Sequence, residues 1–361
     1  MISCRNCGEA FPLHSFPYCC PSCGGLFGFV DGLTYDPGLL QPDLPGIWTY
    51  RSGFALPDRA PLVTLGEGNT PLVQAEFFGS QVWFKLESLN PSGSFKDRGS
   101  AVLASWLRAG NVETAVEDSS GNAGASFAAY ASRAGIQSKI FIPASASGPK
   151  RAQIESYGSQ VIPVPGPRSE AARAVMREVE LGAVYASHAY LPQGTAGIAT
   201  IAYELVEQLG EPPGAILLPV GHGSLLLGIA LGFEALLKGG LIGKRPRLIG
   251  IQSAVFDPLC RAFEAGRLIP ERVPEGKTIA EGVAIAAPYH GEQVLAAVRR
   301  SEGAMLRVAD EQIRVGVEQL ARKGIYVEIT AGLVWDGLRQ LEGKLAGPVV
   351  CIITSHGLKN P

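Results

Sequence analysis

The sequence predicts an α/β protein with two parallel-sheet lobes and a small cysteine-rich module at the N-terminus. From about residue 81 onward, short apolar runs that end in glycine- or serine-rich turns alternate with longer segments of helical periodicity. Of the 361 residues, 46% are hydrophobic and 18% charged, which is enough for large buried cores. Five of the seven cysteines lie in the first 23 residues. A segment this short needs a metal ion or disulfides to fold.

The overall charge argues against two classes of partner. The net charge is −2 and both signs are scattered, so no steering field for nucleic acid or an anionic membrane is expected. The first ten residues lack the apolar stretch of a signal peptide. The most apolar later window, residues 215–233, is interrupted by Pro219, His222 and several glycines. We therefore expect a cytoplasmic protein.

The N-terminal cysteines form two C-x-x-C pairs, Cys4 with Cys7 and Cys20 with Cys23, each followed by glycine. Two such turns about a dozen residues apart are typical of a tetrahedral four-thiolate zinc site. Disulfides are the alternative, and they are uncommon where no secretory signal is present. The sequence does not exclude Cys19 as a ligand in place of Cys20.

A closed four-cysteine site leaves no open position for catalysis, so we expect this zinc ribbon to be structural. Only Arg5 is basic before Arg51, which argues against nucleic-acid binding by the ribbon. The following residues, 31–60, are rich in proline, glycine and aspartate and are expected to form a connecting arm.

Residues 90–100, NPSGSFKDRGS, are the centre of the functional hypothesis. An expected strand at 81–87 leads into this loop, and the small residues of the loop deliver Lys96 to the start of a helix. The macrodipole at a helix N-terminus disfavours an ammonium, so the neutral, nucleophilic amine is favoured there. A surface lysine beside Asp97 and Arg98 is the ordinary alternative.

Two later turns are candidate anion sites. The strand at 114–117 runs into a serine- and glycine-rich turn that opens a helix, and such a turn points N–H groups and hydroxyls at one spot. The buried strand at 215–220 runs into the turn at 221–225 and a second helix, an arrangement that suits a phosphate. An ordinary capped or tight turn is the alternative in each case. Further strands are expected at 139–143, 161–164, 248–252 and 349–354.

These segments, in this order, resemble the motifs of the pyridoxal-phosphate (PLP) enzymes of fold type II, the tryptophan synthase β family. The run SGSFKDRG is especially similar to the lysine motif of threonine synthases, as are G-N-T-P-L at 68–72 and the tail T-S-H-G-L-K at 354–359. The resemblance implies two lobes of PLP fold type II: a large PLP-binding lobe of residues 61–95 and 188–361, and a small mobile lobe of residues 96–187. It also implies a homodimer.

The resemblance also assigns roles to residues. It implies that Lys96 holds PLP covalently, that Asn122 bonds the 3′-oxygen of the cofactor, and that Thr354 meets its pyridine nitrogen, with Ser355 as the alternative. The residues expected to hold the substrate carboxylate are Ser119, Ser120, Gly121 and Ala123, and those expected to hold the cofactor phosphate are Gly221, His222, Gly223, Ser224 and Leu225. His222 departs from the glycine or asparagine common in relatives, and Ile329 and Thr330 break the pattern that follows the glutamate of GIYVEIT.

The implied activity is that of a PLP-dependent lyase acting on a small polar amino acid. A hydroxyl at the pyridine nitrogen makes PLP a moderate electron sink, which favours expulsion of a leaving group, with Lys96 as the general base. The leading hypothesis is conversion of O-phosphohomoserine to threonine and phosphate. Residues 189–197 carry no arginine or lysine for the phosphate, and TIAEGVAI at 278–285 resembles dehydratases and racemases. A serine/threonine dehydratase-type elimination or replacement enzyme is therefore the second hypothesis, and a non-catalytic PLP- or partner-binding protein the third.

Overall fold

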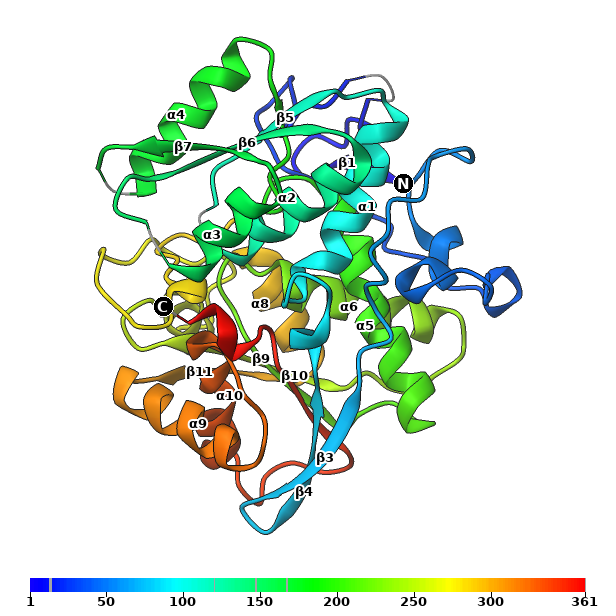
Figure 1. The fold of residues 1–361 in the computed structure, drawn as a ribbon. Helices are drawn as coiled ribbons and strands as arrows, with labels where there is room; N and C mark the ends of the chain where they lie inside the picture. The colour runs from blue at the N-terminus through cyan, green and yellow to red at the C-terminus, as the bar shows by residue number, and fades with distance from the viewer. Residues whose placement is uncertain (13–14, 120, 147, 167, 361) are drawn as a thin grey trace. The chain divides into compact units, whose positions relative to one another are not determined.

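In a computed structural model of the chain, residues 1–12, 15–119, 121–146, 148–166 and 168–360 are described (Figure 1). The chain divides into two compact units. The first comprises Met1–Gly68 and Lys96–Ile198, and the second comprises Asn69–Phe95 and Ala199–Asn360. The expected alternation of strands and helices is confirmed, since a parallel-strand sheet lies in each unit.

The sheet of the first unit has four strands, all parallel, in the order β7-β6-β5-β8. The strands are β5 (Thr114–Glu117), β6 (Gln137–Pro143), β7 (Gln160–Val164) and β8 (Val184–Tyr185), and the helices are α1 (Lys96–Ala109), α2 (Asn122–Ala134), α3 (Pro149–Ser156) and α4 (Arg168–Glu180). Helix α4 packs on the sheet through Ala171 and Val175, which join Val116 and Phe141 in one apolar cluster. Apolar strands with covered faces are typical of parallel sheets.

The N-terminal module is a two-stranded antiparallel ribbon, β1 (Ile2–Cys4) paired with β2 (Phe27–Phe29). Its small core consists of Ile2, Cys4, Cys20 and Phe27, with Phe11 packed against them. The rings of Phe11 and Phe16 lie edge-on to Trp106 of α1, with centroids 5.5 and 4.6 Å away. Because the module buries so few residues, these aromatic contacts anchor it to the unit.

The expected connecting arm contributes to the core of the first unit. It contains two 3-10 helices, η1 (Pro37–Leu39) and η2 (Gly46–Gly53), and η2 buries Trp48 completely. The buried carboxylate of Glu67 accepts hydrogen bonds from Trp48 Nε1 and from Tyr130 Oη of α2, both at 2.7 Å. Glu67 therefore joins the arm to the helix that follows the serine-rich turn. A buried carboxylate is stable only when donors surround it in this way.

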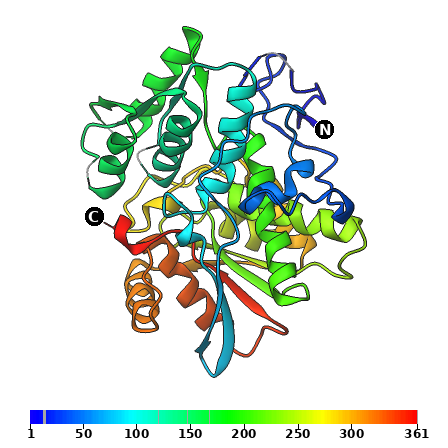
Figure 2. The same cartoon turned by 45° about the vertical axis from the view of Figure 1, so that its right-hand side comes forward.

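The sheet of the second unit has six strands in the order β11-β10-β9-β12-β4-β3. The strands are β3 (Leu72–Phe77), β4 (Ser80–Lys85), β9 (Ala215–Pro219), β10 (Arg247–Ser253), β11 (Ala304–Val308) and β12 (Val349–Ile352). The expected parallel sheet is confirmed for five of these strands, and β3, a strand not expected from the sequence, is antiparallel to β4. The reason is local: Phe78 and Gly79 both have positive φ, +50° and +69°, which gives a two-residue hairpin turn. Figure 2 shows this hairpin beside β12.

The helices of the second unit cover a strongly apolar sheet. They are α6 (Ser224–Lys238), α7 (Pro258–Glu264), α8 (Gly291–Arg300), α9 (Asp310–Arg322) and α10 (Leu333–Gln340), with the short 3-10 helices η3 (Glu87–Leu89), η4 (Glu281–Val283), η5 (Ile329–Gly332) and η6 (Gly357–Lys359). Helix α5 (Gln193–Leu209) begins in the first unit and ends in the second. None of the helices formed by the described residues is long and apolar enough to cross a membrane.

Candidate functional site

The loop before Lys96 is hydrogen-bonded to the C-terminal segment of the chain. The Phe95 N–H donates to the Thr354 carbonyl and the His356 N–H donates to the Gly93 carbonyl, both at 3.0 Å. Gly93 has φ +86°, a backbone conformation that residues with a side chain rarely adopt. Lys96, the residue after Phe95, begins helix α1 as expected. The lysine is thus placed at a helix start by a loop that is fixed to the end of the last strand.

The two hydroxyls at the end of β12 have different surroundings. Ser355 Oγ donates to a carboxylate oxygen of Glu328, and both residues are almost fully buried. Thr354 is 5% exposed, and its Oγ1 has no hydrogen-bond partner among the described residues. A buried hydroxyl without a partner is costly unless another molecule supplies one. Of the two hydroxyls, that of Thr354 is therefore the one whose hydrogen-bonding capacity the described residues leave unused.

Small residues let α1 lie close to its neighbours in the first unit. A Cβ at Gly197 would lie 2.0 Å from the Arg98 carbonyl oxygen, so only glycine fits at that point of α5. On another face of α1, Ser126 Oγ of α2 donates to Asp97 Oδ1 at 2.6 Å and lies 2.8 Å from Ser100 Oγ. The first turn of α1 is thereby fixed, with Lys96 at its start.

The serine-rich turn lies between β5 and α2. The Ser119 N–H donates to Glu117 Oε2 at 2.7 Å, and the Gly121 N–H donates to Ser119 Oγ at 3.3 Å. A Cβ at Gly124 would lie 1.8 Å from the Ser119 carbonyl oxygen, so glycine is required for α2 to pack under the turn. Asn122 and Ala123 form the first residues of α2, where backbone N–H groups lack intrahelical acceptors. Ser120 lies outside the described residues.

Sequence reasoning missed two residues that bond to this turn. His188 Nδ1 lies 3.0 Å from Glu117 Oε1, and the Tyr185 hydroxyl donates to Asp118 Oδ1 at 2.8 Å. Burial raises the pKa of Tyr185 well above its usual value, and the Asp118 carboxylate raises it further. No local pattern marks these residues. The one feature that could have indicated His188 is its position shortly after β8, the strand that pairs with β5.

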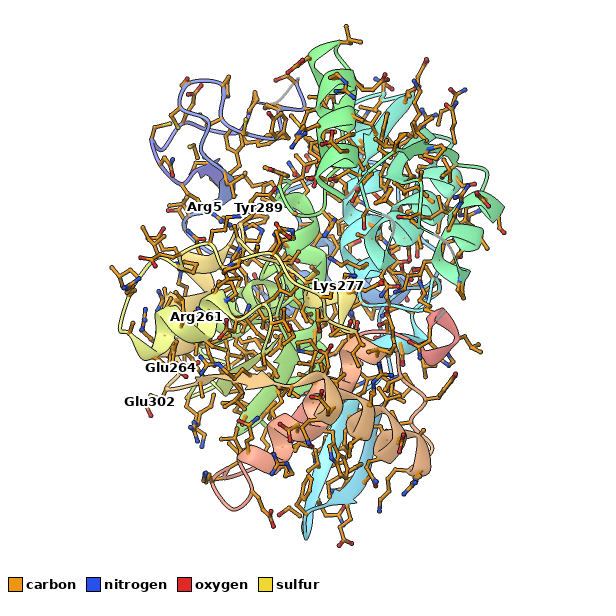
Figure 3. All side chains as sticks on the ribbon, turned by 90° about the vertical axis from the view of Figure 1, so that its left-hand side faces the viewer. Arg5, Arg261, Glu264, Lys277, Tyr289 and Glu302 are labelled. Carbon is orange, nitrogen blue, oxygen red and sulfur yellow. The ribbon has the colours of Figure 1, made fainter. Side chains whose placement is uncertain are left out.

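The glycine-rich turn lies between β9 and α6 in the second unit. Gly223 has φ +102°, and a Cβ there would lie 2.5 Å from Val294. The ring of His222 stacks on Tyr289, with centroids 4.4 Å apart and planes 4° apart, and Tyr289 is labelled in Figure 3. Ser224 and Leu225 are the first residues of α6. Their N–H groups give this turn the donors that an anion requires.

The four cysteines of the two C-x-x-C pairs lie together in the first unit, and all their Sγ atoms are within 4.8 Å of one another. Cys4 and Cys23 are 3.5 Å apart, and Cys7 and Cys20 are 3.7 Å apart. Tetrahedral zinc with bonds of about 2.3 Å would place thiolates about 3.8 Å apart, so the cluster has the size of a zinc site. Cys20 belongs to the cluster and Cys19 does not.

One thiol of the cluster ionises easily. Burial opposes ionisation of Cys4, but hydrogen bonds from the backbone N–H groups of Cys7 and Asn6 outweigh it and lower its pKa to about 7. A thiolate is the form that binds metal, so these backbone donors favour a metal-binding cluster.

The expected site residues fall into two groups. Lys96, Asn122 and the turn at 119–123 belong to the first unit, and the turn at 221–225 and Thr354 belong to the second. Lys96 and Thr354 are connected through the chain: Phe95 is hydrogen-bonded to Thr354, and Lys96 is the residue after Phe95.

Comparison with known proteins gives consistent matches. The sequence model of a family described as "Pyridoxal-phosphate dependent enzyme" matches residues 63–355. The chain is 33% identical to threonine synthase of Methanocaldococcus jannaschii, over 99% of the chain and 92% of the relative. It is 32% identical to threonine synthase of Mycobacterium tuberculosis strain H37Rv, over 91% of the chain and 92% of the relative.

Solved structures have the same fold. The structure of a threonine deaminase from T.th. is 27% identical, with a TM-score of 0.67 over 80% of this chain and 92% of that one. The structure of maize serine racemase is 23% identical, with a TM-score of 0.69 over 80% of this chain and 88% of that one. The second likeness concerns the fold alone.

Removal of either hydroxyl at the end of β12 is expected to change the stability of the protein by a different amount. In protein freed of bound small molecules, Ser355→Ala takes a donor from the buried Glu328 carboxylate and should lower the free energy of unfolding by about 1 to 3 kcal/mol. Thr354→Val replaces a hydroxyl that has no described partner and should change it by less than about 0.5 kcal/mol or increase it. Chemical denaturation measures both. Equal losses would contradict the difference between the two environments.

Proposed function

The chain belongs to the family of pyridoxal-phosphate-dependent enzymes, and from this premise we propose that it is a carbon–oxygen lyase that converts O-phosphohomoserine to threonine and phosphate. The observation that carries the proposal is the similarity to threonine synthases, which extends over 99% of the chain at 33% identity. The lysine motif and the C-terminal T-S-H-G-L-K segment support it.

The residues present fit the cofactor. The Thr354 hydroxyl, which has no partner among the residues that the structure describes, suits a ring nitrogen, and the turn before α6 has no room for a side chain at Gly223. We propose that Lys96 holds PLP covalently, that Asn122 bonds its 3′-oxygen and that Thr354 bonds its pyridine nitrogen. The residues proposed for its phosphate are Gly221, His222, Gly223, Ser224 and Leu225, and those proposed for the substrate carboxylate are Ser119, Ser120, Gly121 and Ala123.

When bound, pyridoxal phosphate supplies an electron sink next to the α-carbon of the substrate. The residues of this chain then bind and orient the substrate and move its protons. The turn at 119–123 fixes the carboxylate, and the Lys96 amine, placed at a helix start that disfavours its charged form, takes the α-proton. A hydroxyl at the ring nitrogen does not hold it protonated as a carboxylate would, so loss of a leaving group is favoured.

A second candidate is the elimination chemistry of a serine or threonine deaminase. The specific observation is the lack of arginine and lysine in residues 189–197, since a phosphorylated substrate is usually bound by such cations. The 27% identity to the threonine deaminase from T.th. supports this alternative. A non-catalytic PLP-binding protein is disfavoured because Lys96 is retained.

The cysteine cluster is proposed to hold one structural zinc ion through Cys4, Cys7, Cys20 and Cys23. Four protein ligands leave no open position, so the metal stabilises the ribbon and takes no part in the reaction.

The domain boundaries predicted from the sequence, the homodimer and the cytoplasmic location remain proposals.

Reduction with borohydride should leave a pyridoxyl group on Lys96, because the proposed covalent bond to the cofactor is reduced in place. Peptide mapping by mass spectrometry locates the group. Lys96→Ala should abolish turnover and remove the label, and Lys359→Ala should retain the label on Lys96. A pyridoxyl group on any other lysine of the wild-type protein would exclude this active site.

Elemental analysis should find about one zinc ion per chain. Cys20→Ser should lose the metal because it removes a ligand, whereas Cys19→Ser, its neighbour outside the cluster, should retain it. Zinc lost from the Cys19 variant and kept by the Cys20 variant would reassign the ligand.

Product analysis tests the proposed reaction. O-phosphohomoserine should give threonine and inorganic phosphate in equal amounts, because each turnover eliminates one phosphate from the γ-carbon and adds one water, whose hydroxyl ends on the β-carbon. Formation of a 2-oxo acid and ammonia from serine or threonine, without turnover of O-phosphohomoserine, would favour the deaminase. If neither occurs while PLP is bound at Lys96, both substrate assignments fail.

A further inference from the structure

The carboxylate of Glu117 joins the serine-rich turn to His188. Glu117 is fully buried at the end of β5; its Oε2 accepts the Ser119 N–H at 2.7 Å, and its Oε1 lies 3.0 Å from His188 Nδ1. The side chain of His188 is 24% exposed, whereas that of Glu117 is 1% exposed. A buried carboxylate is therefore paired with a histidine that is partly exposed to solvent. The proposed function gives neither residue a role.

Both residues lie at the edge of the sheet where a ligand is expected. Strands β5 and β8 are parallel neighbours, with Val116 opposite Tyr185. Glu117 ends β5 and His188 follows β8 by three residues, so both lie beyond the carboxyl ends of their strands. In open parallel sheets, ligands bind outside the carboxyl ends of the strands. The turn at 119–123, proposed for the substrate carboxylate, starts from the same edge.

The pair supplies positive charge at this edge. The Glu117 carboxylate, 3.0 Å from Nδ1, stabilises the protonated form of the His188 imidazole. The imidazolium in turn supplies the charged partner that a buried carboxylate requires. The protonated ring directs its second donor, Nε2–H, away from Glu117. Two cations of the same unit are engaged elsewhere, since Lys139 pairs with Glu178 and Arg151 pairs with Glu155.

We propose that His188, oriented and kept protonated by Glu117, is the residue that binds the phosphate group of the substrate. This inference rests on the proposed function and accounts for the lack of arginine and lysine in the residues that follow, 189–197. Glu117 is the positioning residue, and His188 Nε2 donates to the phosphate. Because Ser119 is bonded to the same carboxylate, the phosphate and carboxylate sites are held at a fixed separation.

The charge of such a site depends on pH. Among the described contacts, Glu117 is the titratable group that meets His188 directly, and the next residue of the chain, Asp118, accepts a hydrogen bond from Tyr185. Tyr185 stays protonated because its pKa is raised, and it donates to Asp118. The imidazole is therefore the group whose charge changes near neutral pH. Its positive charge is lost as pH rises, so affinity for a dianion should fall by up to about tenfold per pH unit above its pKa.

The test measures the affinity of the PLP-bound enzyme for sulfate by calorimetry from about pH 6 to about pH 9, a range that spans the usual pKa of histidine. Sulfate stays fully ionised throughout, so a change in its affinity reports on the protein. The wild type should lose affinity as pH rises. His188→Gln should bind sulfate about 10- to 100-fold more weakly at the acidic end and show no pH dependence. Binding of homoserine, which lacks the phosphate, should be unchanged.

Two matched variants separate binding from a merely structural role. His188→Lys keeps a cation and should retain sulfate affinity with a flat profile below about pH 9. Glu117→Gln keeps the size and one acceptor but removes the charge, so the fall in affinity should move to lower pH. If His188→Gln and Glu117→Gln retain the wild-type profile, the inference is wrong.

The proposed function is tested separately in the same series by turnover of O-phosphohomoserine. Turnover by the wild type with an unchanged KM in His188→Gln would overturn the inference and leave the proposed function standing. Failure of the wild type to bind or convert O-phosphohomoserine would overturn both. An increase in KM of about 10- to 100-fold in His188→Gln, with restoration in His188→Lys, would support the inference.

Discussion

The backbone hydrogen bonds between the loop at 93–95 and the segment at 354–356 are the constraint on which the proposed site depends. The Phe95 N–H is bonded to the Thr354 carbonyl and the His356 N–H to the Gly93 carbonyl. These bonds form an isolated antiparallel bridge between Ser94 and Ser355, separate from the parallel pairing of β12 with β4. They fix the residue before Lys96 to the residue whose hydroxyl has no described partner, although the two are far apart in the sequence. The residue proposed to carry the cofactor therefore follows directly a loop that is hydrogen-bonded to the residue proposed for its ring nitrogen.

Much of the fold could be predicted because its information is local. Apolar runs followed by glycine- or serine-rich turns marked β5, β9 and β12, and small residues before a helical period indicated the helices that follow the turns at 90–95 and 221–225. The cysteine spacing also sufficed, because two C-x-x-C turns on a short ribbon can bring four thiols together in few ways. The antiparallel β3 was missed because its turn is formed by Phe78 and Gly79, and phenylalanine rarely adopts positive φ.

The parts that could not be predicted depend on contacts between distant segments. The choice between Thr354 and Ser355 depends on Glu328, and the partner of Glu117 is His188, 71 residues away. The buried role of Trp48 likewise depends on Glu67 and not on the composition of the arm. Each case involves a carboxylate that is buried because donors from another segment satisfy it. The sequence shows the carboxylate but not its partners, since burial and pairing are properties of the folded chain.

The central claim is that Lys96 and Thr354 hold the same cofactor molecule. A crystal structure of the protein with bound PLP tests this claim most directly. We expect continuous density between Lys96 Nζ and the cofactor, with the pyridine nitrogen within hydrogen-bond distance of Thr354 Oγ1 and the phosphate at the N-terminus of α6. A pyridine nitrogen bonded to Ser355 or to a carboxylate, or a cofactor attached to another lysine, would contradict it.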